Sequence, residues 1–299
     1  MSERRTIGFI GLGNMGVGFT RRLVASGCEV IGYDIDTAKV DAARAWNVAP
    51  AASPADVARA ADLIFVCVVS TQAVETVVLG EDGIATIGRA EGKIVVDVST
   101  TEIEVTKRLA AELADRCGVA FVDAPCSGGP GAAEEGRLAV MAGGEEAVIE
   151  AVRPVMDLVA SRFTRMGEVG AGQATKLVNQ ALVLTNYVVI AESIALGRRL
   201  GVDVGKIPHA LGTGYAGGNL LNDLVPRMVE NDFAPRGFAR QVLKDFHLLG
   251  DAAKSLNLAM PMASEATTLY RMMISQGLGE LDGAAIVTLL DTDGTTKRG

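Results

Sequence analysis

The chain has 299 residues, a formal charge of -8 and a pI near 5.0, which argue against a nucleic-acid-binding surface. Hydrophobic residues make up 49% of it, enough for the cores of two domains. Four scattered cysteines without a C-x-x-C pair, and only two histidines, indicate neither a disulfide framework nor a metal site. Composition therefore predicts a globular protein that binds small molecules and other copies of itself.

The start of the chain leads directly into an apolar run, which leaves no room for a signal peptide. No uncharged apolar stretch of about eighteen residues follows. We therefore expect a cytoplasmic protein with no membrane partner.

The segment from Thr6 to Asp34 combines a predicted strand, a glycine-rich turn, a helix and a second strand that ends in an acid. Gly11, Gly13 and Gly16 follow the first strand at G-x-G-x-x-G spacing. Such glycines allow a tight turn, the approach of a pyrophosphate to bare backbone, and close packing of the helix, whose N-terminus faces the phosphates. Glycine-rich turns also occur for purely steric reasons, but the flanking elements favour dinucleotide binding. The turn residues expected to contact the cofactor also include Leu12, Asn14 and Met15.

Asp34 indicates which cofactor is bound. A carboxylate at the end of the second strand accepts hydrogen bonds from the adenosine ribose hydroxyls and repels a 2'-phosphate. The next residue is Ile35, not the arginine that a phosphate would require. NAD is therefore predicted, and NADP is the less favoured alternative.

Apolar runs alternate with helix-length segments through the first half of the chain. Because these runs lack polar alternation, they predict interior parallel strands of a doubly wound, Rossmann-type α/β sheet. The runs cover residues 63–69, 93–99, 120–125 and 138–144, and Arg162–Met166 is expected to add one more strand. Val68, Val69 and Thr100 come at strand ends, where we expect them to line the cofactor cleft.

The second half of the chain predicts an all-α domain. A long apolar helix is expected from Gly172 to Leu200, and it needs cover on nearly every side, including a partner subunit. Shorter helices are predicted over residues 204–212, 220–231, 241–256 and 261–276. The predicted domains are residues 1–166, which bind the dinucleotide, and 167–299, which bind substrate and form a homodimer or homotetramer.

Four ordered motifs give the chain a specific resemblance. GFIGLGNMG (8–16), DAPCSGG (123–129), GAGQATKLVNQ (170–180) and KDF (244–246) stand in the order and at the approximate separations found in the β-hydroxyacid dehydrogenases. That family includes 3-hydroxyisobutyrate dehydrogenase and is related to 6-phosphogluconate dehydrogenase. The resemblance covers nearly the whole chain, and it implies hydride transfer between a nicotinamide cofactor and a small hydroxy acid.

Ser127, Gly128 and Gly129 form a turn of small residues just after a predicted strand. A hydroxyl group beside exposed backbone amides suits a carboxylate, although a plain turn has the same composition. The resemblance implies that this segment holds the acid group of the substrate.

Lys176 is the candidate catalytic residue. Lysine near a helix start is usually a solvated surface charge, but here the helix is otherwise apolar, an environment that lowers a lysine pKa from about 10.4. The resemblance implies that Lys176 is the general acid/base. Family members often carry asparagine four residues after this lysine, whereas this chain has Gln180 there and Asn179 before it. Either residue therefore remains a candidate for orienting the substrate.

Lys244 precedes an acid on a later predicted helix, a pair that is most often a surface feature. The resemblance implies that Lys244 contacts both cofactor and substrate. Arg236 and Arg240 stand close before it, and the helical spacing of four between Arg240 and Lys244 puts the latter two on one face. These two arginines either enlarge an anion site or line the surface.

Together these features predict an NAD-dependent dehydrogenase of a small 3-hydroxy acid, or a reductase of the matching semialdehyde, that binds a small anionic substrate and needs no metal. A sensor that binds the dinucleotide without catalysis is the alternative from another class. Imine reduction by a related fold is a third possibility, but those enzymes generally lack the lysine. Lys176 favours the dehydrogenase, because a sensor has no use for a lysine on an apolar helix.

Overall fold

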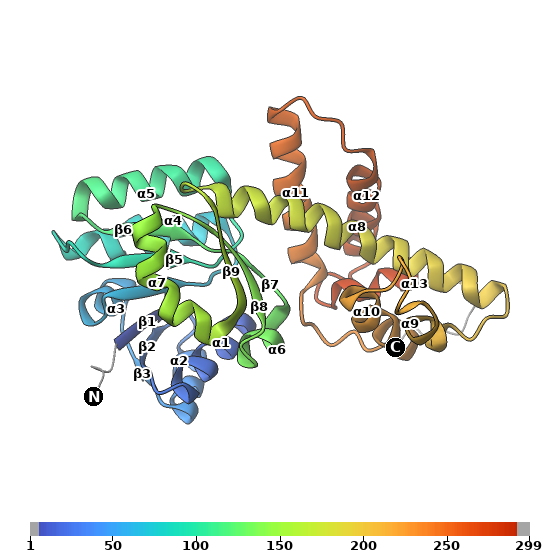
Figure 1. Cartoon of the computed structure of the whole chain (residues 1–299), viewed down its shortest axis with the longest axis horizontal. Helices are drawn as coiled ribbons and strands as arrows, with labels where there is room; N and C mark the ends of the chain where they lie inside the picture. The colour runs from blue at the N-terminus through green and yellow to red at the C-terminus, as the bar shows by residue number, and fades with distance from the viewer. Residues whose placement is uncertain (1–5, 292–299) are drawn as a thin grey trace. The chain divides into compact units, whose positions relative to one another are not determined.

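The computed structural model describes residues 6–291 (Figure 1). By internal contacts the chain divides into two compact units, Met1–Lys176 and Leu177–Gly299. The first unit is an α/β domain built on one sheet, and the second is helical. The predicted fold class, a Rossmann-type domain followed by an all-α domain, is thereby confirmed.

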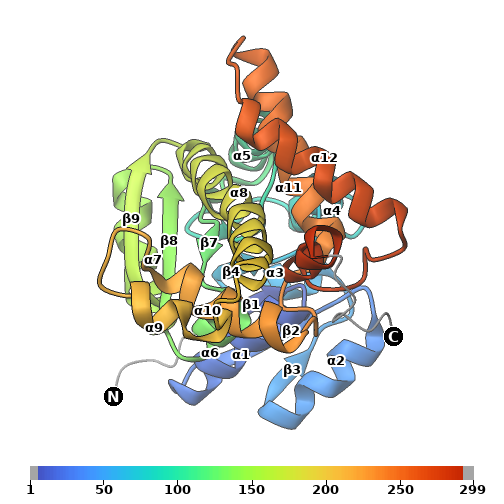
Figure 2. The ribbon, with the colours of Figure 1, turned by 90° about the vertical axis from the view of Figure 1, so that its right-hand side faces the viewer.

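The first unit contains a nine-stranded sheet in the order β3-β2-β1-β4-β5-β6-β8-β7, with β9 paired to β8. The strands from β1 to β6 pair in parallel, as the apolar runs predict for all of them except the short β3, which was not predicted. Their bounds are β1 Thr6–Ile10, β2 Glu29–Tyr33, β3 Val48–Pro50, β4 Leu63–Val66, β5 Ile94–Asp97, β6 Ala120–Asp123, β7 Cys126–Ser127, β8 Leu138–Gly143 and β9 Ala160–Gly167. Figure 2 shows β8 and β9 side by side at one edge.

Helices cover both faces of this sheet, and each face has its own hydrophobic core. Side chains from α1, α2 and α7 form one core with β1, and side chains from α3, α4 and α5 form the other with β4. The bounds are α1 Asn14–Ala25, α2 Thr37–Ala43, α3 Pro54–Ala60, α4 Thr71–Leu79, α5 Ile103–Cys117, α6 Gly129–Glu134 and α7 Glu146–Val159. This doubly wound arrangement places the carboxyl ends of the parallel strands at one edge, where ligands of such folds bind.

The prediction of a parallel strand at 138–144 was wrong in direction. β8 runs antiparallel to both β6 and β7, and only its pairing with β9 is parallel. Between β6 and β8 the chain first forms β7, which pairs with β8, so the link is not the helical crossover that a parallel pair requires. An apolar run reports that a strand is buried on both faces, but it carries no information on direction.

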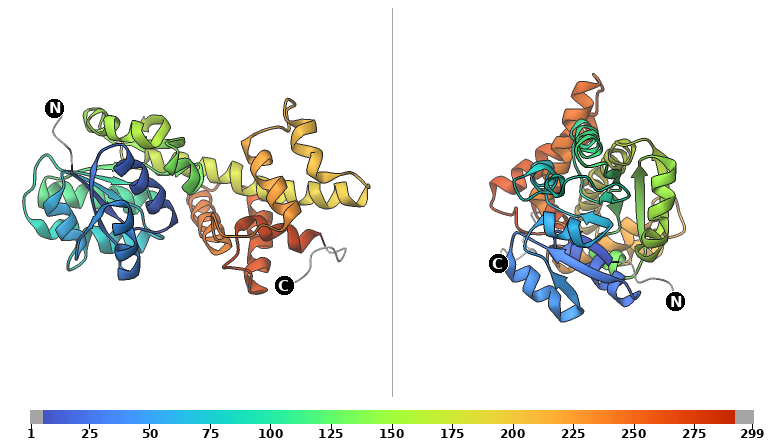
Figure 3. Two further views of the ribbon diagram at one scale, coloured as in Figure 1. Left: turned by 90° about the horizontal axis from the view of Figure 1, so that it is seen from below. Right: turned by 90° about the vertical axis from the view of Figure 1, so that its left-hand side faces the viewer.

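The second unit is made of helices. The first of them, α8 (Ala171–Arg199), begins in the first unit and continues into the second. The remaining helices match the predicted ones to within a few residues, and Figure 3 shows the helices of this unit in yellow to red. They are α9 Ile207–Leu211, α10 Asn219–Glu230, α11 Ala239–Ser255 and α12 Pro261–Ser275, and a short α13 Val287–Leu290 was not predicted. The unit boundary falls inside α8 rather than at residue 166, because the first turn of α8 is hydrogen-bonded to the sheet.

Among the described residues, α8 is the one helix long and apolar enough to cross a membrane by length and composition. Of its most apolar window, 44% is buried inside the chain, and core helices of soluble proteins pass the same test. The helix also carries Lys176, Asn179 and Gln180, which are costly in a lipid environment.

Candidate active site

The glycine-rich turn after β1 contains glycines with different reasons to be there. Gly11 has a φ of +100°, and a Cβ on it would lie 2.1 Å from the carbonyl oxygen of Cys67. A Cβ on Gly16 would lie 2.0 Å from the carbonyl oxygen of Gly11. Gly13, by contrast, has a φ of -73°, and a Cβ there would meet open space, so the protein itself does not require glycine at this position. Space kept clear at the start of α1 fits a bound pyrophosphate.

Asp34 follows β2 and is buried beside this turn. One carboxylate oxygen accepts a hydrogen bond from the Leu12 amide at 2.7 Å, and the other accepts one from the Asp36 amide at 2.9 Å. Each oxygen keeps a second lone pair for a ribose hydroxyl. Lys39 places its Nζ 3.7 Å from the same carboxylate, so a cation that sequence reasoning missed also lies at this end of the site.

The ends of β4 and β5 lie side by side, as the parallel pairing requires. The amide of Val68 donates to the hydroxyl of Ser99 at 3.0 Å, which ties the two strand ends together. Val69 is exposed and Thr100 is half-buried, so both are accessible from solvent. The structure thus brings these predicted cleft residues to the sheet edge that carries the glycine-rich turn.

The Ser127 segment lies in β7, where Ser127 pairs with Ala139 of β8. Gly128 and Gly129 have φ values of +133° and +74°, a backbone shape that residues with side chains rarely adopt. Ser127 itself is half-buried. The turn therefore presents a hydroxyl group and sharply turned backbone amides at a sheet end, as a carboxylate site needs.

Lys176 reaches from α8 to β7. Its side chain is only 7% exposed, and its Nζ donates a hydrogen bond to the carbonyl oxygen of Cys126 at 2.8 Å. Cys126 directly precedes Ser127, so the structure places the predicted catalytic lysine beside the predicted carboxylate-binding turn within one unit. A solvated surface lysine would not be held in this way.

Two buried carboxylates stand at the ends of adjacent strands, and sequence reasoning missed both. Asp97 on β5 pairs in register with Asp123 on β6, and neither side chain is exposed. Burial raises the pKa of Asp97 to about 7, against hydrogen bonds from Ser99 that lower it. Burial also raises the pKa of Asp123 to about 6, although backbone amides of the α8 turn lower it. Each stands at the end of an apolar run in the sequence, and the same pattern had identified Asp34, so it could have pointed to these two residues as well.

The raised pKa of Asp97 predicts that the folding stability of the protein depends on pH. Its pKa is about 7 in the fold and about 3.9 when unfolded, so the unfolded chain binds fewer protons between these values and stability falls as pH rises. Asp97→Asn removes this term. The difference in unfolding free energy between the variant and wild type should shift in favour of the variant by on the order of 2–3 kcal/mol from pH 5 to pH 8. Urea denaturation of both proteins at each pH measures the change, and an equal difference at the two pH values would contradict it.

In the second unit, a polar chain connects the remaining predicted residues. Asn179 donates to the amide oxygen of Gln180 at 2.8 Å, and Gln180 in turn donates to Asp245. The other Asp245 oxygen lies 3.0 Å from the Nζ of Lys244. Gln180 is buried and Asn179 only half-buried. Both residues lie about one helical turn after Lys176 on α8.

Arg236 and Arg240 each pair with local acids. Arg236 contacts Asp223 and Asp232, both at 3.1 Å, and Arg240 contacts Glu280 at 2.7 Å. These contacts neutralise the arginine charges on the surface of the second unit. They favour the structural role over the anion site.

The cysteines do not offer a nucleophile. All four are free, and burial raises the pKa of each thiol, that of Cys126 to about 11. Within residues 6–291, no group of three or more histidine, cysteine, aspartate or glutamate side chains is arranged to hold a metal ion. Lys176 remains the candidate for proton transfer at this site.

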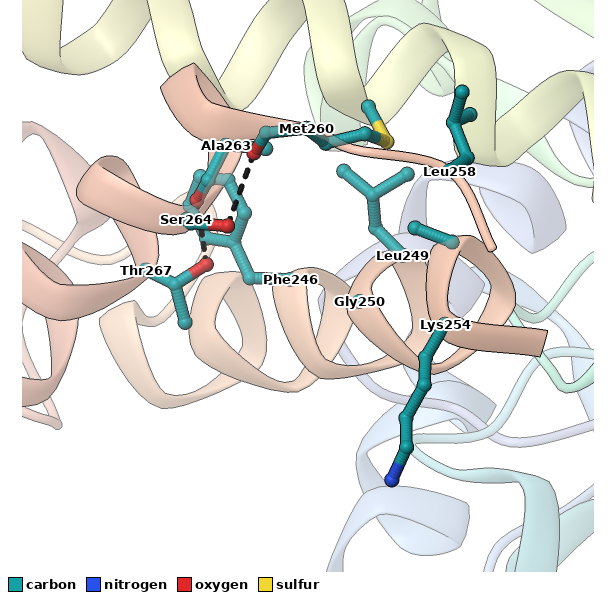
Figure 4. A pocket seen from close by; sticks show the side chains of 10 residues that line it. Phe246, Leu249, Gly250, Lys254, Leu258, Met260, Ala263, Ser264 and Thr267 are labelled. Carbon is teal, nitrogen blue, oxygen red and sulfur yellow. Dashed lines mark hydrogen bonds between the residues drawn. The ribbon is translucent and has the colours of Figure 1, made fainter. Parts of the chain in front are cut away.

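A cavity of about 190 Å³ lies in the second unit between α11 and α12 (Figure 4). Leu249, Leu258 and Met260 line it together with small and aromatic side chains, and Lys254 points away from them. The cavity contains none of the predicted site residues. Ser264 and Thr267 add hydroxyl groups to its lining.

Two family models match consecutive parts of the chain. The NAD binding domain of 6-phosphogluconate dehydrogenase matches residues 6–167, and the NAD-binding domain of NADP-dependent 3-hydroxyisobutyrate dehydrogenase matches residues 170–290. Together they cover nearly every described residue. The chain therefore contains the dinucleotide-binding domain that its glycine-rich turn predicts.

Characterised relatives resemble the chain over nearly its whole length. It is 33% identical to 2-(hydroxymethyl)glutarate dehydrogenase of Eubacterium barkeri, over 96% of this chain and 95% of the relative. It is also 33% identical to 2-hydroxy-3-oxopropionate reductase of Escherichia coli, over 95% and 97%.

Solved structures show the same fold. A 3-hydroxyisobutyrate dehydrogenase of Salmonella typhimurium superposes with a TM-score of 0.86 at 29% identity, covering 95% of this chain and 99% of that one. An imine reductase of Pseudomonas shares the fold at a TM-score of 0.67, but with 20% identity over 95% and 98% of the two chains. With the site geometry, these matches establish that the chain belongs to the β-hydroxyacid dehydrogenase family and is a dinucleotide-dependent hydroxyacid oxidoreductase.

Proposed function

We propose that the protein is an NAD-dependent dehydrogenase of a small 3-hydroxy acid, or a reductase of the matching semialdehyde. The observation that carries this proposal is the position of Lys176. It is buried, it is bonded to the Cys126 carbonyl, and it lies next to Ser127 in the unit that carries the dinucleotide-binding turn. The substrates named for the relatives, all small hydroxy acids or oxo acids, support the same class.

The residues of the first unit would divide the chemistry as follows. NAD, which the Gly11–Gly16 turn and Asp34 would hold, would supply the acceptor for the hydride that leaves the alcohol carbon. Neutral Lys176 takes the hydroxyl proton at Nζ, while its N–H bond to the Cys126 carbonyl keeps the lone pair in a fixed direction. In the reverse reaction its ammonium group returns the proton to the carbonyl oxygen. Loss of hydride and proton converts the alcohol into the carbonyl product, so atoms and charge balance.

The substrate acid group is assigned to Ser127 and the amides of Gly128 and Gly129. A hydroxyl donor and turned amides bind a carboxylate without a formal positive charge. Lys244 of the second unit is proposed to add a cation for the substrate or cofactor, and Gln180 to orient the substrate hydroxyl. Asp245 neutralises part of the Lys244 charge, so we expect Lys244 to contribute less to substrate binding than the Ser127 turn does.

The alternatives have weaker support. A sensor without catalysis would bind the dinucleotide but would not need Lys176 buried beside Ser127. For the imine reductases, the likeness at 20% identity shows the fold alone. A panel of 3-hydroxyisobutyrate, glycerate, threonate, 2-(hydroxymethyl)glutarate and sulfonated analogues, each assayed with NAD and NADP, separates these cases. If the protein turned over none of these compounds, the proposal would be contradicted. If it turned over several, the highest kcat/KM would identify the preferred substrate.

The cofactor preference gives a direct prediction. The buried carboxylate of Asp34 should favour NAD by kcat/KM, since it would lie against the 2'-phosphate of NADP. Asp34→Ala should narrow that preference by at least about tenfold, because 1.4 kcal/mol of repulsion corresponds to this factor. Asp34→Asn removes the charge and keeps one of the two oxygens that accept from the Leu12 and Asp36 amides, so it separates the effect of charge from that of losing the whole side chain. A wild-type preference for NADP would contradict the prediction and point to Lys39.

We further propose a cytoplasmic dimer or tetramer assembled through the second unit. Val178, Leu182, Val189 and Leu196 are all 41–63% exposed, and their spacing places them on one stripe of α8. Such a stripe needs apolar cover from a partner. Light scattering of the detergent-free protein at micromolar concentration should give a multiple of 31.1 kDa. The mass of a single chain would refute the proposal.

A further inference from the structure

The first turn of α8 is held by two side chains outside the residues assigned to the chemistry. A helix start leaves its first backbone N–H groups without partners inside the helix. Here the amides of Gly170 and Gln173 each donate to a different oxygen of Asp123, both at 2.8 Å. One fully buried carboxylate at the end of β6 thus caps the helix that carries Lys176.

Gln173 makes a second connection, to the end of β5. Its side-chain nitrogen donates to the carbonyl oxygen of Ser99 at 2.9 Å, and its side-chain oxygen accepts from the Thr101 amide at 3.1 Å. The side chain is fully buried. Asp97 is bonded to the same loop, because its carboxylate accepts a hydrogen bond from the Ser99 amide at 2.9 Å. The helix start is therefore bonded to two adjacent strand ends.

Glycines allow this close approach. A Cβ on Gly172 would lie 2.5 Å from the carbonyl oxygens of Asp123 and Met141, and a Cβ on Gly143 would lie 2.4 Å from an Asp123 carboxylate oxygen. Backbone therefore packs directly on backbone around Asp123. The position of the first turn of α8 has little freedom relative to β6 and β8.

We propose that Asp123 and Gln173 are positioning residues for Lys176, which hold the first turn of α8 so that its Nζ stays against the Cys126 carbonyl. Lys176 follows Gln173 by about one turn, and Cys126 follows Asp123 by three residues. The two ends of the Lys176 hydrogen bond are thus anchored by one buried cluster. This inference rests on the proposed role of Lys176 as the acid/base.

The test compares Gln173→Leu, Asp123→Asn and wild type. Gln173→Leu keeps the volume and removes both side-chain hydrogen bonds, whereas Asp123→Asn keeps one acceptor. Because a misplacement of about 1 Å costs about 10²-fold, each variant should lower kcat by about 10- to 100-fold and leave NADH binding within about twofold. Leu113→Ala, in the α5 core of the same unit, is the matched destabilised control and should keep kcat.

Two readouts that do not depend on activity complete the test. Hydrogen exchange in a peptide covering residues 168–178 should be faster in both variants than in the control. Acetylation of Lys176, followed by mass spectrometry, should also be faster by at least about tenfold if the side chain leaves its buried position. Faster exchange and labelling with reduced kcat would support the proposal.

Other outcomes would overturn it. If kcat in Gln173→Leu falls no further than in Leu113→Ala, the contact is merely structural. If hydrogen exchange and Lys176 acetylation become faster but kcat does not change, the position of the first turn of α8 does not limit the reaction. If Asp123→Asn does not fold, Gln173→Leu decides alone. Failure of the proposed function is recognised separately, by full activity of a Lys176→Ala variant, whatever the exchange data show.

Discussion

Replacing Lys176 with alanine is expected to lower kcat by about 10²- to 10⁴-fold, the usual loss when a positioned acid/base is removed. The reason is that Lys176, held against the Cys126 carbonyl beside Ser127, is the group proposed to take the hydroxyl proton. Both histidines lie in the second unit, and the Cys126 thiol stays protonated because burial raises its pKa to about 11. Steady-state kinetics with the best substrate of the panel measure the loss.

Two further variants make this result specific. Ser127→Ala should raise KM more than it lowers kcat, because a contact with the substrate acid group acts equally on ground state and transition state. Lys206→Ala removes an exposed lysine that pairs with Asp203 at 3.1 Å, and it should change neither constant. NADH fluorescence should show unchanged cofactor binding in Lys176→Ala. If that variant folds and keeps more than about a tenth of wild-type kcat, Lys176 is not the acid/base.

Sequence patterns identified the parts of the site that are local in the chain. The turn from Gly11 to Gly16, the acid at Asp34 and the long helix α8 each follow from a short stretch of residues and its periodicity. Strands β1, β2, β4, β5 and β6 were also predictable, because each is a compact apolar run next to a helix-length segment, whereas the three residues of β3 form no such run and were not predicted. The four motifs then added the family, which the comparisons show independently.

What the sequence could not supply is contact between distant segments. The buried role of Lys176 depends on the Cys126 carbonyl, fifty residues earlier in the chain. The two bonds between Gln173 and the Ser99 loop span 74 and 72 residues. Neither pairing has a sequence signal, since glutamine and a backbone carbonyl carry no mark of their partner. The antiparallel direction of β8 escaped prediction for the same reason, because it is set by pairing with β7.

Replacing Gly13 with alanine is the second change with a large expected effect, and here the effect should fall on binding alone. The backbone at Gly13 has a φ of -73°, which alanine adopts freely, and its Cβ would have no atom of the chain within 4 Å. Unfolding free energy should therefore change by no more than about 1 kcal/mol, the scale of a helix N-cap change. A pyrophosphate packed on this backbone would meet the added methyl group, and such overpacking costs about 1–3 kcal/mol.

Gly16→Ala provides the contrasting control. Its Cβ would fall 2.0 Å from the Gly11 carbonyl oxygen and 3.2 Å from the Phe9 ring, so the turn must shift even without a ligand. We expect Gly16→Ala to lower the unfolding free energy by at least about 2 kcal/mol. Gly13→Ala should instead keep its melting temperature and raise the Kd for NADH by at least about tenfold, which corresponds to 1.4 kcal/mol. Thermal melts and fluorescence titration of both variants separate the two effects. Unchanged NADH affinity in a folded Gly13→Ala protein would mean that the dinucleotide does not approach the turn at this residue, and the placement of its pyrophosphate at the start of α1 would have to be abandoned.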